Sequence, residues 1–169
     1  YVSTGNDPDF WQFNATNITQ MIAKFRIGGR CYGQPAAAND YVYVGCTNGD
    51  IYQFNASNVS IKVANLELGL GNSDSSPVVT EDYVYIGSDN DNIYQLNATN
   101  VSRIIATYTT GGNVGSTGAL AHGYLYIGSN DKSFYQLNAS NISIQIANFT
   151  GANAFSDDSA VNDLYIFTS

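Results

Sequence analysis

The sequence predicts an all-β protein made of about four repeats, each a small antiparallel sheet of four strands. Its 13 Tyr and 8 Phe favour strands over helices. One motif, clearest at Tyr83–Ser102, returns at Tyr41–Ser60 and at Tyr124–Ser143, and a degraded copy occupies Phe10–Thr19. A fixed period of this size is typical of repeat architectures. The first Asn of the shared Asn-Ala-Ser/Thr-Asn segment is found at Asn14, Asn55, Asn97 and Asn138.

Each repeat resolves into four short strands. The run Tyr83–Ser88 is the clearest, because its side chains alternate at period two. The other strands of this repeat are expected at Ser75–Val79, Ile93–Leu96 and Val101–Tyr108, separated by polar or Gly-rich turns. Four antiparallel strands in about 40 residues make one blade of a β-propeller. The predicted fold is therefore β-propeller-type repeats, with about four four-stranded antiparallel blades.

One repeat domain is expected over residues 1–169. Its repeats run over residues 1–32, 33–74, 75–115 and 116–156, with a final partial repeat at 157–169. The second-strand motif has five copies, including a weak one at Tyr1–Gly5 and a last one at Asp163–Ser169, whereas the Asn hairpin has four. A closed ring would take its missing first strand from Ser156–Val161, and the last strand would then be surplus.

The surplus strand leaves three arrangements open. It can pair with another subunit by strand addition, in which case the blades form a closed ring. The chain can be part of a larger ring. The blades can also form an open array, whose head-to-tail contacts would generate a fibre. Self-association through the terminal strands is expected, and because both ends fall inside a repeat we expect a mature or partial product.

Charge excludes two classes of partner. The chain has only 6 Lys and Arg against 14 Asp and Glu, a net charge of −8. So few cations cannot neutralise a phosphate track, which argues against nucleic acid. The acidic balance also argues against an anionic membrane surface, and no apolar run approaches the roughly 20 residues of a membrane helix. Neither nucleic-acid binding nor membrane insertion is expected.

Three motifs in order resemble the pyrroloquinoline-quinone-type (PQQ-like) propeller repeat. They are Ser-Ser-Pro-Val-Val at Ser75–Val79, Tyr-Val-Tyr-Ile-Gly-Ser at Tyr83–Ser88 and Ile-Tyr-Gln-Leu-Asn-Ala at Ile93–Ala98. The style of the Asn-rich repeats is similar to that of secreted archaeal propeller proteins. The family's closing Trp is missing, and the single Trp11 falls in the third-strand slot. Nothing matches the family's quinone pocket, so the resemblance implies the fold without a cofactor or dehydrogenase activity.

Nine Asn-x-Ser/Thr sequences are possible N-glycan acceptors, since none has Pro in the middle. Asn and Ser also favour turns through local backbone hydrogen bonds, and this alternative is stronger for the first Asn of each pair than for the second. Attached glycans would explain how a Tyr-rich, charge-poor surface stays in solution. The nine acceptors are Asn14, Asn17, Asn55, Asn58, Asn97, Asn100, Asn138, Asn141 and Asn148.

A disulfide is expected between Cys31 and Cys46, the only two cysteines. They would lie opposite each other on the first and second strands of one blade. The matching positions of the next repeat are Ser73 and Ser88, so both members of the pair differ together. Two free buried thiols are the alternative. A disulfide and N-glycans would both place the protein outside the cytosol or at the cell surface.

Other polar groups are expected to be structural. The acidic run at Asp89–Asn92 lacks the Gly and the distant Glu of a calcium loop, so a solvated hairpin turn is expected. The single His122 sits beside Gly123 in a predicted turn, without a metal or catalytic role. The Tyr-x-Tyr pairs can serve either as a carbohydrate platform or as packing between blades, and packing is expected. They are Tyr41 and Tyr43, Tyr83 and Tyr85, and Tyr124 and Tyr126.

These features predict a non-enzymatic, extracellular, N-glycosylated structural repeat protein that self-assembles into a surface layer or fibre. The alternative is a propeller binding module, adhesin-like, that holds a glycan or a peptide. A degenerate quinoprotein is a third interpretation. No metal and no cofactor are expected apart from the covalent glycans.

Overall fold

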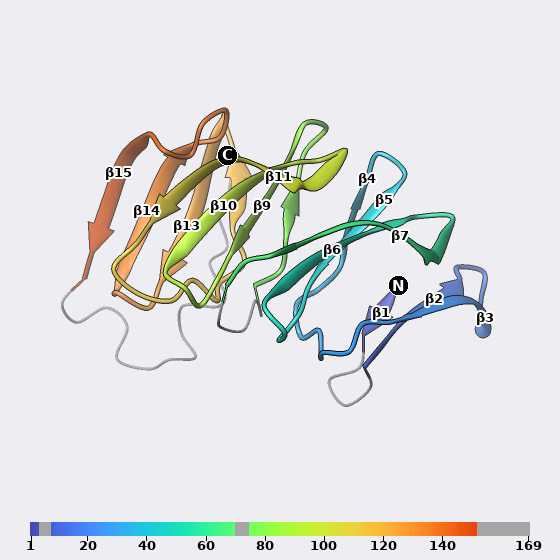
Figure 1. Cartoon of the computed structure of the whole chain (residues 1–169). Coiled ribbons are helices and arrows are strands. Elements are labelled where there is room, and N and C mark those ends of the chain that lie inside the picture. The colour runs from blue at the N-terminus through green and yellow to red at the C-terminus, as the bar shows by residue number, and fades with distance from the viewer. Residues whose placement is uncertain (4–7, 70–74, 152–169) are drawn as a thin grey trace.

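The computed structural model describes residues 1–3, 8–69 and 75–151 of the chain. All regular elements within these ranges are strands, and they form four antiparallel sheets arranged in a row (Figure 1). The all-β, propeller-type architecture expected from the sequence is confirmed. The described residues contain no helix with the length and apolar character needed to span a bilayer.

The four sheets are called blades 1 to 4 in chain order, and within each blade neighbouring strands follow one another along the chain. Blade 1 contains β1 (Val2–Ser3), β2 (Asp9–Asn14) and β3 (Asn17–Arg26). Blade 2 contains β4 (Ala36–Ala38), β5 (Tyr41–Gly45), β6 (Asp50–Asn55) and β7 (Asn58–Glu67). Blade 3 contains β8 (Val78–Val79), β9 (Tyr83–Gly87), β10 (Asn92–Asn97) and β11 (Asn100–Thr109). Blade 4 contains β12 (Ala119–Ala121), β13 (Tyr124–Ser129), β14 (Ser133–Asn138) and β15 (Gln145–Thr150).

The core lies between blades and not at one centre. Three clusters of buried side chains fill the three boundaries between successive blades. The middle strands of blades 2 and 3 are covered on both faces, so Val42, Tyr43 and Val44 are all fully buried although they alternate in direction. Sheet-on-sheet packing of this kind makes the stability of each blade depend on its neighbours.

The first hairpin has the same form in blades 2 and 4, where the first and second strands join through two residues with positive φ, Asn39 and Asp40 in blade 2 and His122 and Gly123 in blade 4. Such turns match the twist of antiparallel strands. The corresponding hairpin of blade 3, residues 80–82, has no residue with positive φ. The second hairpin of blade 2 contains Asn48-Gly49, a dipeptide that typically takes positive φ at both positions of a two-residue turn. Here only Gly49 has a positive φ (83°).

That hairpin is longer than a two-residue Asn-Gly turn, because the Gly49 N–H donates to the Cys46 carbonyl at 3.0 Å. Asp91 and Lys132 take the same left-handed position in blades 3 and 4, with φ of 67° and 69°. One residue with positive φ after a tight turn is a common three-residue hairpin connection.

The described blades form an open row, with blade 1 and blade 4 at opposite ends (Figure 1). No strand of blade 1 is hydrogen-bonded to a strand of blade 4 among these residues. Strand β1 fills the second-strand slot expected at Tyr1–Gly5, and it pairs with β2 through Val2 and Ser3. The expected ring staple at Ser156–Val161 and the surplus strand at Asp163–Ser169 lie outside the described residues.

Alkaline pH is expected to unfold the protein through its buried tyrosines. Loss of hydration on burial, the larger cause, and the neighbouring phenols Tyr41 and Tyr83 raise the pKa of Tyr43 and of Tyr85 to about 12. Their contribution to stability is complete below the ordinary tyrosine pKa of about 10 and falls as pH rises toward 12. Circular dichroism and tyrosinate absorbance should therefore change together between these pH values. Ionisation of all tyrosines with no loss of sheet signal would contradict the burial.

Candidate functional site

The Asn-Ala-Ser/Thr-Asn segment joins the third and fourth strands of every blade and is here called the Asn turn. All four Asn turns lie on the same edge of the row, and those of blades 2, 3 and 4 lie beside the hairpins that join first and second strands. In blade 3 the Ala98 N–H donates to the Asp82 carbonyl at 2.9 Å and holds the two turns together. The four Asn turns are Asn14–Asn17, Asn55–Asn58, Asn97–Asn100 and Asn138–Asn141.

Both asparagines of a turn use their side-chain oxygen in the same way. In blade 3 the Asn97 Oδ1 accepts from the Thr99 N–H at 3.0 Å, the Thr99 hydroxyl at 2.7 Å and the Asn100 N–H at 3.0 Å. The Asn100 Oδ1 accepts from the N–H and the hydroxyl of Ser102 at 3.1 and 2.6 Å. All eight turn asparagines hold the Ser or Thr two residues later in this way. The turn chemistry expected from the sequence is therefore present at every site.

The two positions of a turn differ in exposure. The first Asn of each turn is half-buried, whereas Asn17, Asn100 and Asn141 are exposed and Asn58 is half-buried. The amide nitrogens of Asn100 and Asn141 donate no hydrogen bond to any described residue, and the same holds for Asn55, Asn97 and Asn138 at the first position. The two positions therefore differ in exposure alone, which favours the second position except at Asn58. Asn148 is exposed on β15, away from the turns.

The Asn turn is also the point where one blade contacts the next. The Ala139 carbonyl of blade 4 accepts from the Tyr85 hydroxyl of blade 3 at 2.5 Å and from the Gln95 Nε2 at 3.1 Å. The Gln95 Oε1 in turn accepts the N–H of Ile142 at 3.1 Å. One glutamine thereby satisfies a donor and an acceptor of the neighbouring backbone within a buried interface.

The same arrangement recurs at the other two interfaces. Tyr43 and Gln53 of blade 2 donate to the Ala98 carbonyl at 2.5 and 3.0 Å, and Val101 N–H donates back to Gln53 at 3.1 Å. Tyr1 and Gln12 of blade 1 donate to the Ala56 carbonyl at 2.6 and 3.0 Å, and Val59 N–H donates back to Gln12 at 3.1 Å.

This role of the glutamines was not predicted from the sequence. The sequence contains an indication of it, because one Gln recurs in each repeat inside an otherwise apolar strand. These residues are Gln12, Gln53, Gln95 and Gln136. A polar residue at a buried strand position requires hydrogen-bond partners. In each blade the register between third and fourth strand shifts directly after this glutamine, so a bulge lies between it and the Asn turn.

The disulfide between Cys31 and Cys46 is confirmed, and both residues are buried. Its position differs in one respect from the expectation, since Cys31 lies in the linker before β4 and Cys46 directly follows β5. In blade 4 the Ser129 hydroxyl, at the position of Cys46, donates to the Gly112 carbonyl of the preceding linker at 2.8 Å. The disulfide makes in blade 2 the linker-to-blade connection that a hydrogen bond makes in blade 4.

Tyr-x-Tyr pairs pack between blades at Tyr43 and Tyr85, which are almost fully buried. Their rings meet those of Tyr41 and Tyr83 edge-on, with centroids 6.4 and 6.2 Å apart. A carbohydrate platform is therefore wrong for these two buried residues. His122 is exposed at a hairpin tip with φ of 51°, as the turn prediction required.

The acidic hairpins hold local hydrogen bonds. In the run Asp89–Asn92, Asn90 donates to the Tyr94 hydroxyl at 2.7 Å. Burial acts to raise the pKa of Asp131, but hydrogen bonds from the Tyr135 hydroxyl and from the Gly111 and Ser133 N–H groups outweigh it and lower that pKa. The described ranges contain no group of three or more His, Cys, Asp or Glu side chains placed to hold a metal ion.

No protein-family model matches the chain, and no curated protein matches its sequence. Solved structures do match its fold. BamB from Moraxella catarrhalis aligns with a TM-score of 0.67 at 14% identity, over 79% of this chain and 41% of BamB. The computationally designed protein Ika8 aligns at 0.65 and 8% identity, over 77% of this chain and 40% of Ika8. The designed protein Ika4 aligns at 0.63 and 9% identity, over 73% and 74%.

At these identities the likeness shows the fold alone. The aligned part of the chain spans less than half the length of BamB and of Ika8. Together with the four sheets, the comparison defines the chain as a repeat protein of the β-propeller type. The finer resemblance to the PQQ-like family stays a prediction from the motifs.

Replacing Gln95 by Leu should destabilise the protein by about 1–3 kcal/mol, because the Ile142 N–H would stay buried without its acceptor. Gln20→Leu on the exposed face of β3 is the matched control, because it removes only an exposed hydrogen bond from the Asn14 amide at 3.1 Å, and a change within about 0.5 kcal/mol is expected there. Urea unfolding followed by circular dichroism measures both. Equal stability of the two variants would contradict the bridging role of Gln95.

Removing the disulfide should also lower stability. It closes a loop with a sequence separation of 15 residues, and a loop of this length corresponds to about 3 kcal/mol in the chain-entropy view. The double variant Cys31→Ser, Cys46→Ser should therefore unfold at a lower urea concentration than the oxidised protein. Reduced wild-type protein serves as the control. No difference between oxidised and reduced protein would show that the disulfide does not constrain the unfolded chain.

Proposed function

We propose that this chain is an extracellular, N-glycosylated structural module whose blades form a rigid scaffold and whose Asn turns carry the sugars. The single observation that supports the proposal best is the line of paired acceptor sequences along one edge of the row. Glycans attached there would cover that edge and leave the two ends of the row accessible. A modular stack with one decorated edge is suited to a surface coat or a fibre.

Two further features support this location and role. Disulfides persist in oxidising compartments, and the disulfide of blade 2 is compatible with an extracellular or cell-surface protein. Hydrophobic side chains also stay exposed on the outer strands or directly before them, close to the acceptors, among them Ile61 on β7, Ile104 on β11 and Ile144 just before β15. Attached sugars would shield such residues from water and from non-specific contacts.

The proposed role is non-enzymatic and needs no cofactor. Adding pyrroloquinoline quinone with calcium to the purified protein should leave its absorption spectrum equal to the sum of the separate components. A new absorption band with bound quinone would favour a quinoprotein instead.

Protein purified from its native source should have an intact mass above the 18.2 kDa of the polypeptide, and enzymatic or chemical deglycosylation should remove the excess. Glycopeptide mapping should find higher occupancy at Asn17, Asn100 and Asn141 than at the first Asn of each turn, because their side chains are exposed. A native mass equal to that of the bare polypeptide would reject the glycosylated coat, but not the fold.

A further inference from the structure

The two ends of the row carry complementary halves of the interface that joins blades inside it. Each interior interface has a donor face, made by a Tyr of the second strand with a Gln and an apolar residue of the third strand. It also has an acceptor face, made by the Ala carbonyl of the next Asn turn and the N–H of the apolar residue after that turn. Blade 4 presents a donor face, and blade 1 presents an acceptor face.

The donor face of blade 4 consists of Tyr126, Phe134 and Gln136. Its counterparts in blade 2 are Tyr43, Ile51 and Gln53, and all three are fully buried against blade 3. In blade 4 the three residues are only half-buried, and the Gln136 amide donates to the Tyr126 hydroxyl at 3.2 Å. The donors that bridge blades elsewhere bond to each other here.

The acceptor face of blade 1 centres on Ala15 and Ile18. Ile18 is 77% exposed, whereas Val59, Val101 and Ile142, at the same position of the other Asn turns, are 0% exposed. Ala15 is exposed too, while Ala98 at its position in blade 3 is fully buried. The apolar residue that follows the Asn turn is thus buried in three blades and exposed in blade 1.

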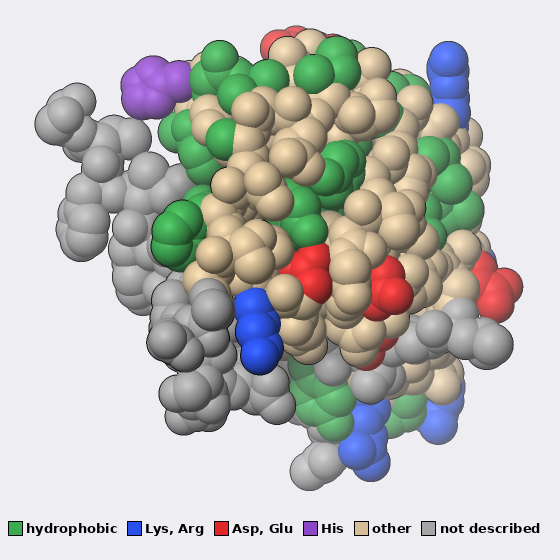
Figure 2. Space-filling model, turned by 90° about the vertical axis from the view of Figure 1, so that its left-hand side faces the viewer, with side chains coloured by type: hydrophobic (Ala, Val, Ile, Leu, Met, Phe, Trp, Pro, Cys, Tyr) green, Lys and Arg blue, Asp and Glu red, His purple; other side chains and the backbone are tan. Residues whose placement is uncertain are grey.

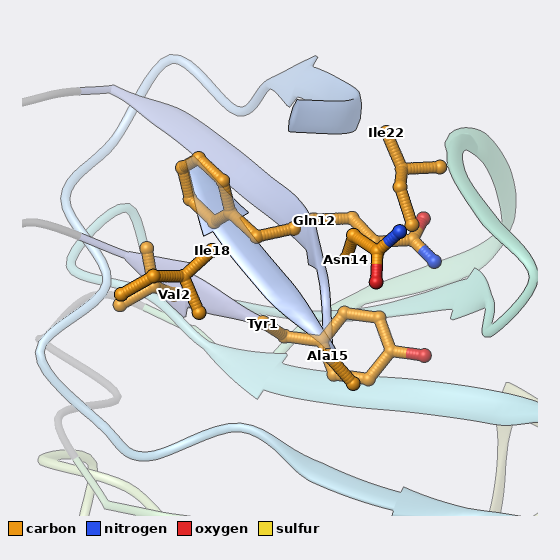
Figure 3. A pocket seen from close by; sticks show the side chains of 8 residues that line it. Tyr1, Val2, Gln12, Asn14, Ala15, Ile18 and Ile22 are labelled. Carbon is orange, nitrogen blue, oxygen red and sulfur yellow. The ribbon is translucent and has the colours of Figure 1, made fainter. Parts of the chain in front are cut away.

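Both faces are hollowed. At the acceptor face a cavity of about 700 Å³ is lined by Tyr1, Val2, Phe13 and Ile18 among others, and Figure 3 shows the lining side chains around it. At the donor face a smaller hollow of about 190 Å³ is lined by Tyr126, Phe134, Gln136 and Phe149. Figure 2 looks onto this end of the row and shows hydrophobic side chains gathered over blade 4.

We propose that the donor face of blade 4 in one copy of this chain docks onto the acceptor face of blade 1 in a second copy. Tyr126 and Gln136 would donate to the Ala15 carbonyl, and Ile18 would donate its N–H to Gln136. A second copy of the chain fits because the contact would repeat the interface between blades. Three interfaces inside the chain already use this pairing, at 2.5–3.1 Å. The contact is head-to-tail, so copies join either into a closed ring or into a filament.

Glycans at the second Asn of a turn do not obstruct this contact, whereas Asn148 lines the donor-face hollow and Asn14 lines the acceptor-face hollow, so the contact requires these two acceptors to be bare. Asn100 and Asn141 stay exposed although the residues that follow them, Val101 and Ile142, are buried in an interface. Asn17 stands in the same relation to Ile18, so a sugar on Asn17 can point to solvent while Ile18 is covered. The inference rests on the structural role proposed above, but not on the presence of sugars.

The test uses the whole unglycosylated 169-residue chain, made in a host without the glycosylation machinery, and sedimentation velocity over a concentration series. Wild-type protein should associate as concentration rises. Ile18→Asp, which disables the acceptor face, should weaken association by roughly 30-fold or more in Kd, as at an interface hot spot. Gln136→Glu, which cannot donate to the Ala15 carbonyl, should weaken it similarly.

Ile61→Asp is the matched control, because Ile61 is 53% exposed on β7 and belongs to neither face. It should associate like the wild type, and all three variants should keep the wild-type melting temperature at a concentration at which the wild type is monomeric. Mixing Ile18→Asp with Gln136→Glu should give a one-to-one complex that does not grow further, since each variant retains one working face.

Wild-type protein that stays monomeric at its highest soluble concentration would overturn the proposal, and so would association that neither end substitution weakens. The second result would point instead to pairing through strand edges or the exposed outer strands. Binding of an added glycan or an unrelated peptide in the hollow of blade 1, with no self-association, would identify a binding module instead. Because no sugar is present in this experiment, its failure is separate from a failure of the glycosylation proposal.

Discussion

A single glutamine per blade determines how this molecule is organised. In blades 1 to 3 it lies in the middle of a buried strand, where an amide without partners would be unfavourable, and it bonds to both a carbonyl and an N–H of the next blade. Apolar side chains supply most of the attraction between blades, but hydrophobic contacts are not directional and would allow one blade to slide along the next. The paired hydrogen bonds of Gln95 with Ala139 and Ile142 fix the height and the angle at which one blade meets the next.

The Asn turn and that glutamine act together, because the turn presents the backbone groups that the glutamine binds. Its side-chain oxygens shape the backbone, and the shaped backbone presents one carbonyl and one N–H toward the preceding blade. Asn97 is therefore important to the interface between blades 2 and 3 although its side chain does not cross it, because it holds the turn that contains Ala98. The exposed amide of Asn100 remains available for a second, unrelated use.

Much of the fold could be predicted from the sequence because the repeat makes its own internal comparison. The strand at Tyr83–Ser88 was visible in the alternation of one copy, and its period located the others. The pairing of Cys31 with Cys46 could be predicted because the next repeat has Ser at both matching positions, Ser73 and Ser88. The role of Gln95 was not predicted, since alternation alone does not separate a polar side chain facing solvent from one facing another sheet. The backbone conformation of Asn48, which lacks the positive φ typical of an Asn-Gly turn, was not predicted either, because a dipeptide does not determine the length of its hairpin.

Each joint between blades is assembled from one half on either side, and every full unit of the chain carries both halves. Lengthening the protein by one duplicated unit would therefore create one more complete joint without any compensating substitution elsewhere. Shortening it by one unit would rejoin matching halves in the same way. Such a design makes the number of blades an easily altered property, and it explains in physical terms how near-identical segments can be kept along a chain while its length changes.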